Sequence, residues 1–183
     1  CDLGQADNDG KTPAHWAARF GHEHCLLFLK NQGCNFDQVN NWGETLAFLA
    51  AENGHEACLC FLKGNGCDLK QADNIGRTPS QRAAKNGHYN CLSLLNNSGC
   101  DLKQEDKYGY SPAHRAAGFG HEKCLKLLKE SGCDLGKPAF NSTTALHLAA
   151  ENGHEGCLRL LIDAGHNLKQ LDRNGQTPVH KVA

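Results

Sequence analysis

Histidine and cysteine are the residue types of this chain best suited to chemistry, and each occurs eleven times among 183 residues. Imidazole and thiolate groups are common zinc ligands and common partners in nucleophilic catalysis. Their spacing argues against both uses, because most of them recur at one fixed interval along the chain. A catalytic residue has no reason to recur in every copy of a unit. The spacing therefore favours structural positions.

Close clusters of ligands or catalytic motifs would be needed to reverse this interpretation. Zinc requires four convergent ligands, usually from closely spaced pairs of cysteines. Cys58 and Cys60 are the only close pair, and a helix would separate their side chains by about 200° around its axis. Glycine-rich dinucleotide or phosphate loops, the zinc-protease motif and the serine-hydrolase elbow are all missing from the sequence. The sequence thus predicts no enzyme, no metal site and no cofactor.

The fixed interval runs through the whole chain without an insertion. One cysteine column is Cys25, Cys58, Cys91, Cys124 and Cys157, a second is Cys1, Cys34, Cys67, Cys100 and Cys133, and Gly-His pairs begin at Gly21, Gly54, Gly87, Gly120 and Gly153. Such a period is the signature of a repeat solenoid. We expect a single domain, residues 1–183, with repeats 1–33, 34–66, 67–99, 100–132 and 133–165 and a partial repeat 166–183.

Each unit has the signals of two short helices. Thr12 supplies an N-cap hydroxyl before Pro13, and Gly21 ends that first helix. The second helix is predicted from Glu23 to about Lys30, with an apolar stripe on one face. Gly33 follows where a left-handed residue commonly ends a helix. The Asp-x-x-Gly tetrapeptides between units are typical of turns.

These motifs resemble those of the ankyrin family, which has a repeat of this length and a Thr-Pro-Leu-His signature. The matching segments begin at Thr12, Ser111 and Thr177, whereas those at Thr45, Thr78 and Thr144 depart from the signature. The resemblance implies an α-helical solenoid of stacked helix-turn-helix repeats with β-hairpin-like finger turns. It also implies protein binding in place of catalysis. Repeat five lacks the Asp-x-x-Gly turn at Ala139–Ser142, so we expect an altered finger there.

The same resemblance assigns structural roles to nine histidines and to both cysteine columns. First-helix histidines would hydrogen-bond the repeat turn, and Gly-His histidines would order the loop; they are His15, His114, His147 and His180, and His22, His55, His88, His121 and His154. Both cysteine columns should be small, buried side chains. Stacked helices lie about 10 Å apart, too far for a disulfide within a column. Reduced thiols favour a cytoplasmic setting, with a nuclear one also open, and Cys60 should be exposed and react first.

The resemblance implies that a partner binds the concave surface formed by finger tips and by the exposed sides of first helices. The positions that vary between repeats on that surface are the ones to consider. The candidate residues, rich in types that dominate interfaces, are Trp16, Arg19, Phe20, Trp42, Ile75, Arg77, Arg82, Lys85, Tyr108, Tyr110, Arg115 and Phe119. They suggest an aromatic part, a basic middle and a mixed part, which would suit an acidic-aromatic segment of another protein. Alternatively, Trp16 and Phe20 merely pack against the neighbouring finger.

Composition limits the other partners and leaves three functions open. The net charge of −1 offers no global field for nucleic acid, and no apolar run would insert into a membrane. The first function is a scaffold or adaptor that binds another protein. The second is a regulatory or positioning arm of a larger enzyme or channel, and the third is a thiol-rich metal or redox protein. The chain lacks methionine and ends within a repeat, so we expect it to be a piece of a longer polypeptide.

Overall fold

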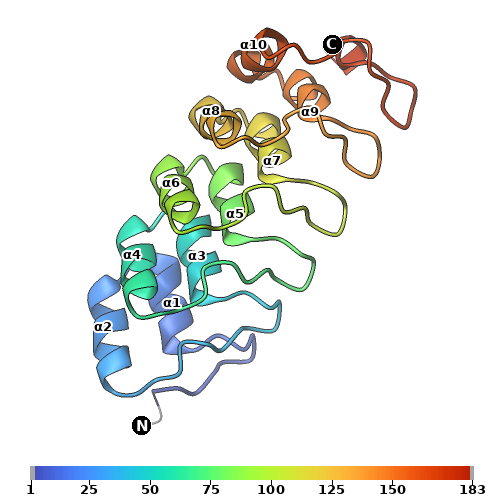
Figure 1. Cartoon of the computed structure of the whole chain (residues 1–183). Coiled ribbons are helices and arrows are strands. Elements are labelled where there is room, and N and C mark those ends of the chain that lie inside the picture. The colour runs from blue at the N-terminus through green and yellow to red at the C-terminus, as the bar shows by residue number, and fades with distance from the viewer. Residues whose placement is uncertain (1–2, 182–183) are drawn as a thin grey trace.

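The structure is a computed structural model that describes residues 3–181, and within that range it is a stack of helix pairs without strands. The first helices of the pairs are α1 (Pro13–Phe20), α3 (Leu46–Glu52), α5 (Pro79–Lys85), α7 (Pro112–Gly118) and α9 (Ala145–Glu151). The second helices are α2 (Glu23–Asn31), α4 (Glu56–Gly64), α6 (Tyr89–Asn97), α8 (Glu122–Glu130) and α10 (Glu155–Asp163). First helices form one row, second helices another, and the fingers project to one side (Figure 1). The predicted helical solenoid is confirmed.

The last unit differs from the expected first helix, because it forms only a single 3-10 turn, η1 (Pro178–Lys181). It packs against α9. Within residues 3–181 no second helix follows that could bury its other side. A short helix without such packing has little to offset the entropy of ordering its backbone.

The helix ends form as the sequence predicts. Thr45 Oγ1 accepts a hydrogen bond from the amide of Phe48 at 3.1 Å, which caps α3. Gly21 follows α1 with φ 75°, in the left-handed region. Its Cβ, if one were present, would collide with the ring of His55 in the next repeat. Glycine is therefore required there by both backbone conformation and close packing.

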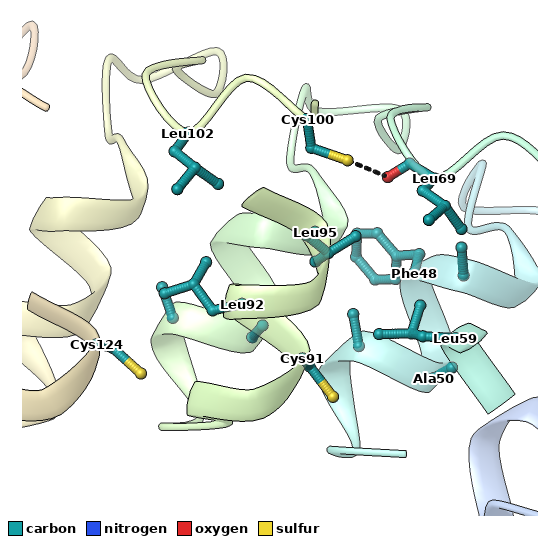
Figure 2. Packing of buried hydrophobic residues seen from close by; sticks show 14 of the residues in the cluster. Phe48, Ala50, Leu59, Leu69, Cys91, Leu92, Leu95, Cys100, Leu102 and Cys124 are labelled. Atoms are coloured by element: carbon teal, nitrogen blue, oxygen red, sulfur yellow. Dashed lines mark hydrogen bonds between the residues drawn. The ribbon is translucent and has the colours of Figure 1, made fainter. Parts of the chain in front are cut away.

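The core follows the two rows of helices. Paired alanines of the first helices, such as Ala50 and Ala51, are completely buried and let neighbouring first helices approach closely. Leucines of the second helices fill the space beside them, as Leu92 and Leu95 do in α6 (Figure 2). The apolar contacts thus form one continuous core along the stack.

The cysteine column that begins at Cys25 lies in this core except at its N-terminal end. Cys58, Cys91, Cys124 and Cys157 are at most 1% exposed. The expectation of burial is wrong for Cys25, which is exposed. Its counterparts are covered by the preceding helix pair, whereas the described residues include no helix pair before α1.

In the second cysteine column the thiols reach back to the preceding repeat. Cys100 Sγ donates to the carbonyl of Leu69 at 3.7 Å (Figure 2), and Cys133 Sγ donates to that of Leu102 at 3.5 Å. Cys100 is buried, and Cys133, like Cys34 and Cys67, is half-buried. The expectation of full burial therefore holds only in part. Cys1 lies outside the described residues.

The Gly-His histidines tie successive repeats together. The Nε2 atoms of His55, His88 and His154 donate to the carbonyls of Arg19, Glu52 and Gly118, at 2.9, 3.1 and 3.2 Å. Each of these bonds spans 36 residues of sequence. The structural role expected for them is thus confirmed at these three positions.

The first-helix histidines bind their own N-cap, and His147 also reaches the next finger. In repeat five, Nδ1 of His147 accepts from the Thr144 amide at 3.3 Å, while Nε2 donates to the Gln176 carbonyl at 3.1 Å. Gln81 stands in this column in repeat three, and its Nε2 donates to the equivalent carbonyl, that of Tyr110, at 3.0 Å. The departure from the signature at Gln81 therefore preserves the bond to the next repeat.

Backbone hydrogen bonds pair neighbouring fingers at equivalent positions of successive repeats. The amide of Lys107 donates to the Ile75 carbonyl at 3.0 Å, and that of Phe140 donates to the Tyr108 carbonyl at 3.2 Å. The finger of repeat five, expected to be altered, thus keeps its place in the stack. What changes is Ser142, which adopts φ 62° where the other fingers have glycine.

Candidate functional site

The predicted partner-binding residues lie at the finger tips and on the first helices, which together we call the finger face. The fingers and the first helices adjoin one another along the stack (Figure 1). Exposure separates the residues into two groups. Trp42, Tyr108 and Phe119 are 45%, 57% and 48% exposed, whereas Arg82 is only 9% exposed.

At the N-terminal end of the finger face, Lys11 lies between two tryptophans. Its Nζ is 4.9 Å from the ring centroid of Trp16 and 4.7 Å from that of Trp42. The Lys11 side chain is nearly buried and also forms an ion pair with Asp9 at 3.2 Å. A cation between two indole rings is favourable because it faces the negative side of both π systems. Lys11 therefore links the first two fingers.

Trp16 and Phe20 form a second contact in α1. Their rings stack with centroids 5.9 Å apart, and the guanidinium carbon of Arg19 lies 5.8 Å from the Trp16 centroid. Phe20 remains 56% exposed and Trp16 is 37% exposed. These side chains pack within their own repeat and still present an aromatic surface to solvent.

In the middle of the finger face, the arginines form ion pairs with carboxylates of the protein itself. Arg77 forms an ion pair with Asp73, and Arg82 lies 3.5 Å from a carboxylate oxygen of Glu52. Both guanidinium groups also lie over the buried ring of Phe48, at 5.9 and 5.2 Å from its centroid. The expectation that Arg82 is an exposed contact residue is therefore wrong, because Phe48 and Glu52 of the preceding repeat cover it.

Lys85 lies on the same helix as Arg82 and is partly buried. Burial and then the charges of Arg82 and Arg115 lower the pKa of Lys85. Lys85 Nζ lies 5.0 Å from the ring centroid of Phe119 in the next repeat. Among residues 3–181, Lys85 forms no ion pair.

The C-terminal part of the finger face is built around Asp106. Its Oδ1 accepts from the amides of Tyr108 and Tyr110, at 2.9 and 3.0 Å, and its Oδ2 pairs with Arg115. Arg115 in turn lies 4.6 Å over the Tyr110 ring. Tyr110 and Arg115 are thereby fixed and half-buried, like Ile75, whereas Tyr108 is largely exposed.

A cavity of about 470 Å³ opens between α7 and α9, beside these residues. Its lining comprises Tyr110, His114, Arg115, Gly118, Phe119, Leu148, Asn152 and His154. Sequence reasoning missed Leu148 and Asn152 as part of this surface. The repeat offered a signal for Leu148, which stands 33 residues after Arg115 in the same first-helix column. Arg115 contacts the finger through Asp106, so its column faces this surface.

A second cavity of about 640 Å³ lies on α1 and α2. Its lining includes Trp16, Phe20, Cys25 and Phe28. This is the side of the first repeat that corresponds, in later repeats, to the surface covered by the preceding helix pair. Because no described helix pair covers this side of the first repeat, Cys25 is exposed.

Neither a metal-ligand cluster nor a membrane-spanning helix is present in residues 3–181. Across residues 3–181, no group of three or more histidine, cysteine, aspartate or glutamate side chains is placed to hold a metal ion. No helix in that range is long and apolar enough to cross a membrane. All cysteines in the described range are free thiols.

Comparisons with known proteins agree with this architecture. The crystal structure of the human ASB11 ankyrin repeat domain is similar, with a TM-score of 0.87 and 26% sequence identity. The similarity covers 94% of this chain and 77% of that chain. No curated protein sequence matches the chain. The family model "Ankyrin repeats (3 copies)" matches residues 1–73, 48–139 and 136–183. Since these matches span its whole length, the chain belongs to the ankyrin-repeat family.

Proposed function

We propose that this chain is a protein-protein interaction scaffold or adaptor that binds a partner through the finger face. Ankyrin repeats generally bind proteins. The observation that carries the proposal for this chain is the exposure of Trp42, Tyr108 and Phe119 on one side of the stack, with exposed fractions of 45%, 57% and 48%. Large aromatic side chains held open on a rigid surface are typical centres of binding energy.

The partner segment we propose carries acidic and aromatic or aliphatic side chains. Lys85 supplies a positive charge that pairs with no carboxylate among residues 3–181. The cavity between α7 and α9 offers the apolar side chains of Phe119 and Leu148 beside polar ones. The exposed rings of Trp42 and Tyr108 offer further aromatic surface. Binding therefore depends on both charge and apolar contact, and salt should weaken it only in part.

Quantitative capture from cell extract tests the proposal. The immobilised chain is compared with a Trp42→Ala/Tyr108→Ala double variant and with a Lys126→Ala/Lys129→Ala control on the exposed side of α8. We expect specific partners to be lost by the first variant and retained by the second. Equal capture by all three proteins, or equal loss in both variants, would contradict binding through the finger face.

We further propose a cytoplasmic or nuclear location. The support is the free state of the cysteines among residues 3–181, because oxidising compartments favour disulfides. Fluorescence imaging of the tagged full-length protein tests this location. Enrichment in a secretory compartment would argue against it.

A further inference from the structure

The charged groups around the middle of the finger face leave one of the described cations without a carboxylate. Arg77 is paired with Asp73, Arg82 with Glu52, and Arg115 with Asp106. Lys85 lies among these pairs and, within residues 3–181, its Nζ has no carboxylate within ion-pairing distance. The expected basic middle is therefore reduced to Lys85 in the described part of the chain. A partner carboxylate would complete the pattern there.

A recess with both apolar and polar walls adjoins this cation. Phe119, over which Lys85 Nζ lies at 5.0 Å, is also a wall of the cavity of about 470 Å³ between α7 and α9. Gly118 and Leu148 line the same cavity, and a Cβ on Gly118 would come within 3.3 Å of Leu148. Glycine at position 118 therefore lets Leu148 of α9 pack closely against the backbone of α7, where both residues line the cavity. The Phe119 side chain is thus a boundary between a charge and a recess.

Part of the lining of the recess is held by contacts within the protein. Arg115 is held by the carboxylate of Asp106 and stacks on Tyr110, and the Tyr110 ring meets that of His114 edge-on, at 5.6 Å between centroids. Another lining residue, His154, donates to the carbonyl of Gly118 at 3.2 Å. Because these side chains are already ordered, filling the recess loses less conformational entropy than ordering all of its lining would.

We propose that Lys85 and this recess form a two-point subsite for an extended partner segment, with Lys85 binding a carboxylate and the recess taking an apolar side chain two residues away. This subsite rests on the proposed function, and it specifies the spacing of the two contacting side chains along the partner segment. Side chains at positions i and i+2 of an extended chain point to the same side, about 6.6 Å apart. Adjacent side chains point to opposite sides and could not enter both points together.

Short capped peptides probe the subsite directly. The ¹⁵N-labelled chain is titrated with N-acetyl-Asp-Gly-Phe-amide and with the reversed order, N-acetyl-Phe-Gly-Asp-amide. We expect at least one order to cause saturable shifts at the amides of Lys85, Gly118, Phe119 and Leu148. Replacing the aspartate by asparagine should weaken the affinity about threefold, as for a partly exposed ion pair. Replacing the phenylalanine by alanine should weaken it more.

Variants of the protein test the contact at Lys85 and the contact in the recess separately. Lys85→Gln should abolish the preference for aspartate over asparagine, whereas Lys126→Gln, on the exposed side of α8, should keep it. Phe119→Ala should reduce the preference for phenylalanine over alanine. The three altered side chains lie on the surface or at its edge, so we expect all three variants to fold. Dispersed amide spectra check this.

The subsite is overturned if neither peptide order gives saturable shifts at these amides, or if the asparagine peptides bind as tightly as the aspartate ones. Saturable shifts confined to Trp16 and Trp42 would also reject it, yet leave the finger face as a binding surface. Failure of the Trp42/Tyr108 capture experiment would instead reject the proposed function. The two ideas can therefore fail separately.

Discussion

The indole Nε1 of Trp16 donates a hydrogen bond to Oδ2 of Asp7, at 3.0 Å, and so joins the first helix to the finger of its own repeat. Further along the stack, Arg115 joins its own finger in the same way, through Asp106. Trp16 is thus both a surface aromatic and a structural contact. Trp42, which donates no such side-chain bond in the described structure, is an aromatic surface of another kind.

Replacing each tryptophan by phenylalanine should separate these roles. Trp16→Phe keeps a ring near Lys11 but leaves Asp7 without its indole donor, so we expect a loss of about 1 kcal/mol in the free energy of unfolding. Trp42→Phe removes no hydrogen bond and should cost less than about 0.5 kcal/mol. Urea denaturation of the two variants checks the difference. Equal losses would show that the Trp16–Asp7 bond adds nothing to stability.

Acid should destabilise the stack through its buried histidines. Burial lowers the pKa of His114 to about 4, and it also lowers the pKa values of His15 and His88. A group with a lowered pKa in the folded state binds its proton more readily when unfolded. Its neutral form therefore contributes stability above about pH 6.5, and that stability is lost as the pH falls towards about 4. For His114 alone the loss would approach about 3 kcal/mol, measurable by denaturation at a series of pH values.

A His114→Gln variant provides the control for this pH dependence. Gln81 shows that an amide in this column can donate to the next finger. The variant gives up the bond from the Ser111 amide to the imidazole, and should be about 1 kcal/mol less stable at neutral pH. Its loss of stability between about pH 6.5 and 4 should be smaller than that of the unaltered chain. An unchanged slope would exclude His114 as its source.

The finger of repeat five should tolerate, and gain from, a glycine. Ser142 has φ 62°, a conformation that costs a residue with a Cβ about 1 kcal/mol. Ser142→Gly should therefore raise the free energy of unfolding by up to about 1 kcal/mol, less the entropy cost of glycine. Ser142→Ala keeps the Cβ and should give no such gain. Thermal denaturation of both variants tests this prediction. If Ser142→Ala were as stabilising as Ser142→Gly, the backbone at residue 142 would not be strained.

The rate at which each cysteine is labelled should depend on the exposure of its thiol and not on its position within the repeat. Burial raises the pKa of Cys58, Cys124 and Cys157 to about 11 and that of Cys91 to about 12, which suppresses their thiolates. Cys25 and Cys60 are exposed. In the native protein we expect iodoacetamide to modify these two first, as read by peptide mass spectrometry. Rapid labelling of Cys91 without unfolding would contradict the buried column.

The sequence by itself determined the fold of this protein, and the reason is physical. Thr45 and Gly21 act on the backbone close to them in the chain, so they mark helix ends without reference to the rest of the molecule. A period kept without insertions then forces equivalent side chains into columns. The resemblance to the ankyrin family predicted structural roles for the columns that hold His55 and His147, and the hydrogen bonds of both residues agree with it.

Only the tertiary structure decided which of those positions a partner could reach. Cys25 belongs to a buried column, yet it is exposed because no described helix pair covers it. Arg82 looks like a surface cation in the sequence, yet Phe48 and Glu52 of the preceding repeat bury and pair it. Lys85, in the same helix, keeps its charge unpaired within the described part of the chain. Burial and charge pairing depend on side chains of the neighbouring repeats, and the type of a residue and its place in its own repeat do not specify them.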